Sequence, residues 1–386
     1  MSARVGIHDL AVATAAHVLD LGDLATAAGI DPAKYRVGLG QEQMSVPGPD
    51  EDVVTMAAAA AAPILARHGA DGIRTLFFAT ESGIDQSKAA GVFVHRLLGL
   101  PASCRVVELK QACYSATAAL QAAADMVARR PEDRVLVIAS DIARYDLDSA
   151  AEATQGAGAV AMLVAADPAI AEVEAAAGVF TADVDDFWRP NDSATAVVDG
   201  KLSIGAYLDG MIGAWDDYRA RGGVAIDAID RFCHHQPFTK MAVKAHRRLG
   251  EHVGVDLGAE SMAASTGYNR RIGNSYTASL YLALAALLDT DDDLAGRRVG
   301  MFSYGSGSVS ELFTLVVAEG YRAHTRGAET EALLAARTPV DVARYRELHA
   351  AAASLGSHDD AEVAQESAGP FHFTGIAGRA RQYRRA

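Results

Sequence analysis

Short apolar runs rich in β-branched and aromatic residues alternate along this chain with alanine-rich stretches of helical character. The clearest apolar runs are residues 74–80 (RTLFFAT), 104–109 (CRVVEL), 134–140 (RVLVIAS) and 159–166 (AVAMLVAA). A long alanine-rich segment, residues 111–130, lies between the second and third runs and predicts a helix. This alternation is typical of an α/β protein in which helices pack on sheets.

The same texture resumes after a less regular region. Residues 180–223 contain both tryptophans and predict either an insertion over a site or irregular packing. Beyond them we expect strands at 230–236, 298–303 and 309–317, and helices at 238–249 and 276–288. No flexible linker and no fixed-period repeat is visible, so we expect two halves, residues 1–167 and 168–386. The basic end of the chain, GRARQYRRA, could contact phosphates, but a solvated terminus is the favoured expectation.

Composition excludes several classes of protein. Half of the 386 residues are apolar, which is ample for a large core, and 35 basic against 49 acidic residues give a net charge of −14. That balance leaves no overall basic field for nucleic acid. The N-terminus lacks a signal-peptide pattern, and the longest apolar run, residues 277–288, is too short to cross a bilayer. Three cysteines make no disulfide framework, so we expect a soluble cytoplasmic protein.

Cys113 falls at the expected start of the helix over residues 111–130. Free N–H groups at a helix N-terminus lower a thiol pKa, which would suit Cys113 to nucleophilic attack. A small buried hydrophobe is the other interpretation of a lone cysteine. Cys104 and Cys233 lie inside expected strands, and we assign both to the core.

Two further side chains stand where strands end. Glu81 directly follows an apolar strand, where desolvation would raise its pKa and suit it to proton abstraction, although a salt-bridged or capping acid would fit equally. His235 lies between a strand and a helix, a usual place for a catalytic side chain, although a core histidine fits there too. In the triplet Cys233–His234–His235, neighbours on a strand face opposite ways. No nearby spacing completes a zinc set, so we expect no metal.

Two glycine-rich segments and one basic stripe complete the candidates. Residues 156–161 match a dinucleotide fingerprint only on paper, because a strand-like run follows where a helix is needed. Residues 304–308 predict either a hairpin turn or a loop whose N–H groups face an oxyanion. Lys240, Lys244 and Arg247 recur at helical spacing and form either a solvated face or a contact for a phosphorylated carrier.

Taken together, these segments closely resemble the 3-hydroxy-3-methylglutaryl-CoA synthase family of the thiolase superfamily. The stretches that carry the resemblance are ATESGIDQSKAAGVFVHRLLGL (79–100), ELKQACYSATAALQ (108–121), ATQGAGAVAML (153–163), DFWRP (186–190), HQPFTKM (235–241), GNSYTASLYL (273–282) and FSYGSGSVSE (302–311). The likeness runs from GIHDL near the N-terminus to the final FHFTGIAGRARQYRR.

The resemblance implies a thiolase-like fold of two similar α/β halves in a five-layer αβαβα arrangement, usually as a homodimer. It implies an acyltransferase that condenses acetyl-CoA with acetoacetyl-CoA and hydrolyses the product from the enzyme. Coenzyme A thioesters are then the substrates, and neither a metal nor a redox cofactor is implied.

The resemblance also assigns roles by motif. Cys113 becomes the acetylated nucleophile, Glu81 the general base and later acid, and His235 the residue that positions the acetoacetyl thioester and acts as general acid. Asn274 and the backbone of Ser306 match substrate and oxyanion positions, the latter acting together with the N–H of Cys113. The remaining matches are Tyr145, Thr154 and Asp186 in the substrate pocket and Lys240 and Lys244 as CoA contacts. Relatives often carry tyrosine where this chain has Asp185, which changes that wall of the pocket.

Three alternatives stay open. A polyketide β-branching synthase of the same family would use the same trio on an acceptor bound to an acyl carrier protein. DFWRP and PFTKM resemble the mevalonate-pathway branch and favour free CoA substrates. A ketoacyl-ACP synthase III or a thiolase shares the fold, but Glu81 speaks against both. A catalytically inactive scaffold would not need Cys113, Glu81 and His235 together.

Overall fold

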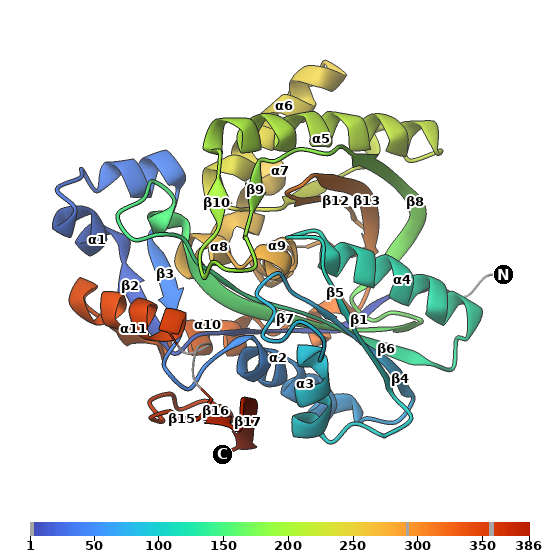
Figure 1. Cartoon of the computed structure of the whole chain (residues 1–386). Helices are drawn as coiled ribbons and strands as arrows, with labels where there is room; N and C mark the ends of the chain where they lie inside the picture. Colours follow the sequence, from blue (N-terminus) through green and yellow to red (C-terminus); the bar gives the residue numbers. More distant parts are fainter. Residues whose placement is uncertain (1–3, 291–292, 355–358) are drawn as a thin grey trace.

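The computed structural model describes residues 4–290, 293–354 and 359–386, and within them a nine-stranded sheet runs through the molecule (Figure 1). Its strand order is β11-β12-β13-β8-β1-β7-β6-β4-β5. The sheet has two parts, β11-β12-β13-β8 and β1-β7-β6-β4-β5. They are connected by the short pairing of β1 with β8, in which Gly6 lies opposite Glu172 and Ile7 opposite Ala171. The nine strands are β1 (Val5–Thr14), β4 (Ile73–Ala79), β5 (Arg105–Leu109), β6 (Arg134–Ala143), β7 (Gly156–Ala166), β8 (Ala171–Thr181), β11 (Arg231–His234), β12 (Arg298–Gly305) and β13 (Val309–Val317).

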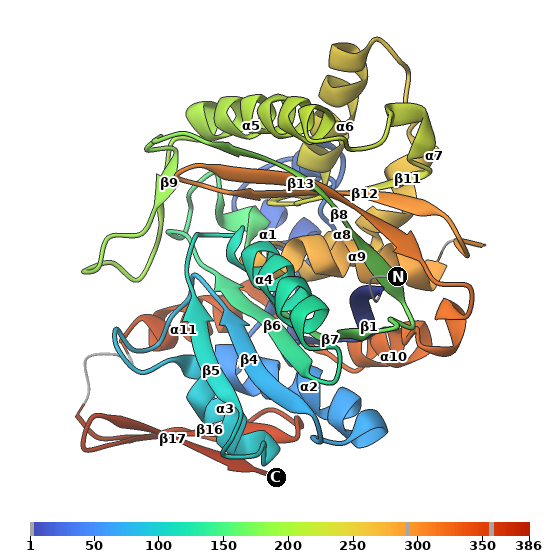
Figure 2. The ribbon, with the colours of Figure 1, turned by 90° about the vertical axis from the view of Figure 1, so that its right-hand side faces the viewer.

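Helices cover both parts of the sheet and fill the space between them. The main ones are α2 (Val53–His68), α3 (Ala90–Leu98), α4 (Ser115–Arg129), α5 (Gly200–Ala220), α6 (Thr239–Val253) and α9 (Ser279–Thr290). Figure 2 shows α5 and α6 above the strands β8, β12 and β13, α4 and α9 in the middle, and α2 and α3 below β4, β5 and β6. Three apolar clusters separate these layers. The expected five-layer αβαβα fold is therefore confirmed.

Most of the expected elements are confirmed within a few residues. The strands expected at 74–80, 104–109, 134–140, 159–166, 230–236, 298–303 and 309–317 correspond to β4, β5, β6, β7, β11, β12 and β13. The helices expected at 111–130, 238–249 and 276–288 correspond to α4, α6 and α9. Residues 156–161 begin strand β7, so their rejection as a dinucleotide fingerprint is also confirmed.

The region around residues 180–223 is more regular than its sequence indicates. It begins in β8, continues through the two short strands β9 (Phe187–Trp188) and β10 (Val197–Val198), and ends in α5, a helix of 21 residues. The long helix was missed because glycines interrupt its pattern. Gly210 and Gly213 are needed where α5 lies close to Ser310 and Phe180.

The basic C-terminus is exposed over most of its length, as expected, but it is an ordered strand and not a free end. Residues Ala380–Arg385 form strand β17, which pairs with β16 (Phe371–Ala377). Tyr383 is buried and donates a hydrogen bond to Asp52, and Arg381 lies 3.2 Å from the same carboxylate. A strand alternates its faces: the Tyr383 ring packs 5.0 Å from the ring of Phe93 on α3, whereas Arg384 and Arg385 are exposed.

The remaining elements are mostly short. They include α1 (Leu21–Ala27), β2 (His17–Asp20), β3 (Gln43–Val46), α7 (Glu260–Ala263), α8 (Gly267–Ile272), α10 (Gly327–Ala335), β14 (Thr338–Pro339), α11 (Val342–Ser354) and β15 (Ala361–Glu362). Of these, α8 packs against α9 in the interior. Among the described residues, no helix has the length and hydropathy that a membrane crossing requires.

Candidate active site

Cys113, Glu81 and His235 all follow the carboxyl ends of parallel strands. Glu81 comes two residues after β4, Cys113 four residues after its parallel neighbour β5, and His235 directly after β11. Ligands of open α/β sheets bind beyond these strand ends. The fold therefore brings candidates that are far apart in sequence to sheet edges suited to chemistry.

The Cys113 thiol faces the Glu81 carboxyl. The sulfur donates to Glu81 Oε2 at 3.7 Å, and both residues are half-buried. Burial raises the pKa of the Cys113 thiol well above its usual value, and the carboxyls of Glu81 and Asp141 raise it further. The expected lowering of this pKa by a helix N-terminus is therefore wrong. Helix α4 begins at Ser115, so Cys113 lies before it in a tight turn in which Ala112 has a φ of 43°.

Glu81 is held by a carboxylate that the sequence analysis missed. Asp141 Oδ1 accepts hydrogen bonds from the backbone N–H of Glu81 and Ser82, each at 2.9 Å, and from the Thr80 hydroxyl at 2.7 Å. Asp141 Oδ2 accepts both the N–H and the hydroxyl of Thr277. Asp141 is fully buried on β6, so an acid inside an apolar strand was the signal available in the sequence.

The pKa of Glu81 follows from this environment. Burial raises the pKa of Glu81 well above its usual value, and the neighbouring Asp141 raises it further. Arg189, from the DFWRP segment, opposes the shift, and its guanidinium donates to the Glu81 carbonyl at 2.9 Å. A carboxyl with a raised pKa can take a proton from a weak carbon acid and return it later.

His235 is buried and neutral. The backbone N–H of His235 donates to the Phe302 carbonyl at 2.8 Å, and the backbone carbonyl of His235 accepts from the Tyr207 hydroxyl at 2.6 Å. Burial lowers the pKa of the ring to about 3. The buried Nδ1 of the ring has no hydrogen-bond partner among the described residues, which is uncommon for a buried polar atom. His234 turns away and meets His246 Nδ1 at 3.1 Å, as the strand alternation predicts.

The turn between β12 and β13 is a hairpin whose loop is fixed by side-chain hydrogen bonds. Gly307 donates to Asp186 Oδ1 at 2.8 Å, Tyr304 donates to Asp186 Oδ2 at 2.8 Å, and Gln111 donates to the Ser306 carbonyl at 3.1 Å. Asp186 was expected as a substrate contact. In the structure both of its oxygens serve to fix the turn that carries Ser306, next to the segment before Cys113.

Aromatic rings form the opposite wall. Tyr145, Phe187 and Tyr276 meet edge to face with centroids 5.8 to 6.4 Å apart, and Cys113 packs against this cluster. Asn274 is buried, donates to the Tyr145 hydroxyl at 3.5 Å and accepts from the Tyr276 N–H at 2.9 Å. The backbone N–H of Asn274 donates to the Thr154 carbonyl at 3.0 Å. Tyr276, which the sequence analysis did not name, therefore joins Tyr145, Asn274 and Thr154 in one wall.

The basic stripe lies on α6, which begins four residues after His235. Lys240 and Arg247 line a cavity of about 990 Å³, and the Lys244 amine lies 5.6 Å from the centre of the Phe238 ring. The expected helical spacing is confirmed.

Among the described residues, no three His, Cys, Asp or Glu side chains are grouped as metal ligands. The arrangement offers a thiol, a carboxyl with raised pKa and a neutral imidazole, which suits acyl transfer through a covalent intermediate.

Two family models match this chain. One, described as "Hydroxymethylglutaryl-coenzyme A synthase N terminal", matches residues 1–169, and its C-terminal counterpart matches residues 251–347. The chain is 42% identical over 353 residues to a hydroxymethylglutaryl-CoA synthase of Enterococcus faecalis, covering 90% of this chain and 91% of that protein. It is 35% identical over 334 residues to the polyketide biosynthesis 3-hydroxy-3-methylglutaryl-ACP synthase PksG of Bacillus subtilis, covering 80% and 79%.

Solved structures agree with these sequence matches. A crystal structure of HMG-CoA synthase complexed with CoA superposes with a TM-score of 0.93 at 38% identity and covers 99% of this chain and all of the other. MvaS in complex with 3-hydroxy-3-methylglutaryl coenzyme A gives a TM-score of 0.92 at 40% identity over the full length of both chains. The HMG synthase of the curacin pathway, in complex with apo donor-ACP, gives 0.92 at 33% identity, with 99% of this chain covered and all of that one.

Proposed function

Because the chain belongs to the hydroxymethylglutaryl-CoA synthase family, we propose that it condenses acetyl-CoA with acetoacetyl-CoA and releases 3-hydroxy-3-methylglutaryl-CoA and CoA. It is an acyl-transferring condensing enzyme of that family. The observation that carries the proposal is the contact of the Cys113 thiol with the Glu81 carboxyl at 3.7 Å.

The first step is the acetylation of Cys113. Its sulfur attacks the acetyl carbonyl, the bond from that carbonyl to the sulfur of CoA breaks, and the thiol proton passes in net to the departing CoA sulfur, a transfer that does not require Glu81. The raised pKa of the thiol supports this route, because a proton that stays on sulfur must be removed as the sulfur attacks. The N–H groups of Cys113 and Ser306 are proposed to bind the carbonyl oxygen on which negative charge develops.

The second step joins two carbons. Glu81 takes a proton from the acetyl methyl group, and the resulting carbanion attacks the ketone carbon of acetoacetyl-CoA. His235 hydrogen-bonds the ketone oxygen and passes its ring proton to the alkoxide as it forms, and the proton that Glu81 removed returns to the ring through solvent. In net, one proton moves from the methyl carbon to the new hydroxyl. A neutral imidazole suits this role, because it can donate a hydrogen bond to the ketone before any charge forms. Water then hydrolyses the thioester to Cys113 and frees the product.

Two variants test the assignment. Cys113→Ser should lose covalent labelling by radioactive acetyl-CoA, because the thiol that forms the thioester is gone. Glu81→Ala should still be acetylated and yet form no product. Normal condensation by Glu81→Ala would show that another group is the base. Wild-type protein without acetoacetyl-CoA is the control, since it should accumulate the acetylated form.

The second candidate is condensation onto a carrier-bound acceptor. It is favoured by the 35% identity to PksG and by the likeness to the curacin enzyme in complex with donor-ACP. The 42% identity to the Enterococcus faecalis enzyme favours free CoA. Parallel assays with acetoacetyl-CoA and with an acetoacetyl carrier protein separate the two, and a clear preference for the carrier protein would overturn the first proposal.

We further propose a cytoplasmic homodimer that serves the mevalonate pathway, with no metal or redox cofactor. Family membership supports these points. Sedimentation of the purified chain tests the dimer, and full activity after dialysis against a chelator tests the independence from metal.

A further inference from the structure

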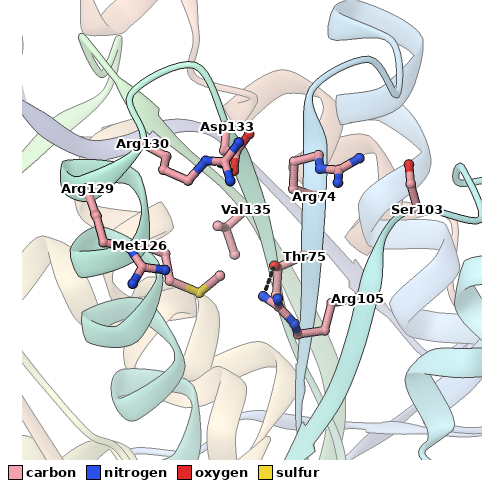
Figure 3. Close-up of a pocket in the computed structure, with 9 residues that line it drawn as sticks. All are labelled: Arg74, Thr75, Ser103, Arg105, Met126, Arg129, Arg130, Asp133 and Val135. Carbon is pink, nitrogen blue, oxygen red and sulfur yellow. Dashed lines mark hydrogen bonds and ion pairs between the residues drawn. The ribbon is translucent and has the colours of Figure 1, made fainter.

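A small basic pocket lies at the opposite end of α4 from Cys113 (Figure 3). Its volume is about 120 Å³. Arg74 and Arg105 reach it from β4 and β5, and Arg129 and Arg130 from the end of α4. The hydroxyl residues Thr75 and Ser103 complete its polar lining. Neither the reaction nor the proposed CoA contacts use any of these side chains.

The pocket holds more positive charge than its surroundings neutralise. Asp133 is its one acidic lining residue, and it lies 3.2 Å from Arg130, which also meets Glu132 at 3.4 Å. Among the described residues, Arg74, Arg105 and Arg129 have no carboxylate within 4.0 Å. These three guanidinium groups therefore keep their charge without a carboxylate partner beside the pocket.

Part of this cluster is held in place. Arg105 and Thr75 are cross-strand neighbours on the paired strands β5 and β4, and the Arg105 guanidinium donates to the Thr75 hydroxyl at 3.3 Å. Arg129 and Arg130 stand on the last turn of α4, across the opening from them. The carbonyl end of a helix disfavours an anion by itself, so any affinity for an anion must come from the arginines.

We propose that this pocket binds a phosphate group, either free inorganic phosphate or the terminal phosphate of a small ester. The guanidinium fork matches two oxygens of a phosphate, and the pocket presents several such forks with two hydroxyls. Its volume has room for several water molecules and hence for one tetrahedral oxyanion, but not for a whole coenzyme. Helix α4 has 15 residues, which at its rise per residue places the pocket roughly 20 Å from the thiol.

Calorimetric titration of the whole protein with inorganic phosphate, in chloride buffer of constant ionic strength, tests this site. We expect saturable binding to the wild type and about tenfold or greater weakening in the double variant Arg105→Gln/Arg129→Gln. Arg105→Lys/Arg129→Lys keeps the charge without the fork and should fall between the two. Thermal unfolding in phosphate-free buffer checks that each variant is folded.

Two matched variants serve as controls. Arg221→Gln/Arg379→Gln makes the same change of charge at two exposed arginines elsewhere, and Lys240→Gln/Lys244→Gln removes the proposed CoA contacts. Both should bind phosphate like the wild type. Loss of binding in the lysine variant, equal binding in Arg105→Gln/Arg129→Gln, or the absence of saturable binding to the wild type would each overturn the proposal.

A final arm identifies the source of the phosphate. Glycerol 3-phosphate that competes with inorganic phosphate would show that the pocket takes terminal phosphates of esters, whereas no competition would show a site for the free ion. Either outcome supports the phosphate site. The site does not depend on the proposed reaction, because binding is measured without substrate.

Discussion

The carboxylate of Asp141 accepts five hydrogen bonds from two segments of the chain. Those donors belong to the turn that carries Glu81 and to Thr277. A buried carboxylate with all its partners satisfied is rigid, and losing one partner is costly. Asp141 therefore positions Glu81, and its charge contributes to the raised pKa of that residue.

Asp141→Asn should impair condensation more than acetylation. The amide places an N–H₂ group where a donor already points, so the Glu81 turn loses part of its support, and we expect kcat to fall by about 100-fold, the equivalent of two to three kcal/mol. Removing a like charge also lowers the pKa of Glu81. The acid limb of the kcat/KM profile should therefore move to lower pH, a shift that mere loss of stability would not produce.

Asp125→Asn is the control for this substitution, because Asp125 is exposed on α4. It should leave both kcat and the pH profile unchanged. A pH profile of Asp141→Asn identical to that of the wild type would show that the charge of Asp141 does not act on Glu81.

The site could be predicted from the sequence only in part. Strand ends indicated Glu81 and His235, but each had a structural alternative, and only the family resemblance favoured the catalytic interpretation. Asp141 and Tyr207 were missed because their roles depend on contacts with Thr277 and His235, 136 and 28 residues away. The prediction of a lowered thiol pKa was wrong because the helix begins at Ser115, two residues after Cys113, and burial raises the pKa.

Among the elements, α5 shows why a regular helix can escape a sequence pattern. Its backbone lies directly on β8, where a Cβ at Gly178 would stand 2.0 Å from the Tyr218 nitrogen and 2.2 Å from the Ala214 oxygen. Contact this close requires small residues, and glycines on α5 itself weaken the helical pattern. Seven strands of the central sheet were predictable from their apolar runs, whereas β1 and β8 were not predicted.

Gly178→Ala should destabilise the fold. The new methyl group meets backbone atoms of α5 that cannot turn aside, so helix and strand must separate, and we expect a loss of about 3 kcal/mol in the free energy of unfolding. Urea unfolding followed by circular dichroism measures it. Gly205→Ala, on α5 with nothing within 4 Å of the new Cβ, should instead be neutral or stabilise by about 0.5–1 kcal/mol.

Across the whole molecule, burial acts on two sets of titratable groups with opposite signs. It lowers the pKa of His8, whose ring lies 5.1 Å from His68 and 6.0 Å from His324, and these rings lower it further. It raises the pKa of Glu51 to about 7, and the nearby carboxylates of Asp50 and Asp52 raise it further, although the backbone N–H donors of Gly48 and Ala16 oppose the shift. The histidine favours folding at high pH and the carboxyl favours it at low pH.

The sign follows from linkage. Below its unfolded pKa of about 6.5, His8 binds more protons in the unfolded chain than in the folded one, so stability is lost as the pH falls. Between its unfolded pKa of about 4.5 and its folded pKa of about 7, Glu51 binds more protons when folded, so stability is gained as the pH falls. Within this window the two residues oppose each other.

Single substitutions should therefore reveal a dependence of the unfolding free energy on pH that partly cancels in the wild type. Relative to the wild type, Glu51→Gln should lose up to about 2 kcal/mol of unfolding free energy between pH 7 and 5.5, because the gain from Glu51 is absent. His8→Gln should move the opposite way over the same range. Urea unfolding at about pH 7, 6.25 and 5.5 measures the pH dependence of stability in both variants. Parallel slopes in the two variants would show that these groups do not titrate with folding, since any loss of packing at either position is the same at every pH.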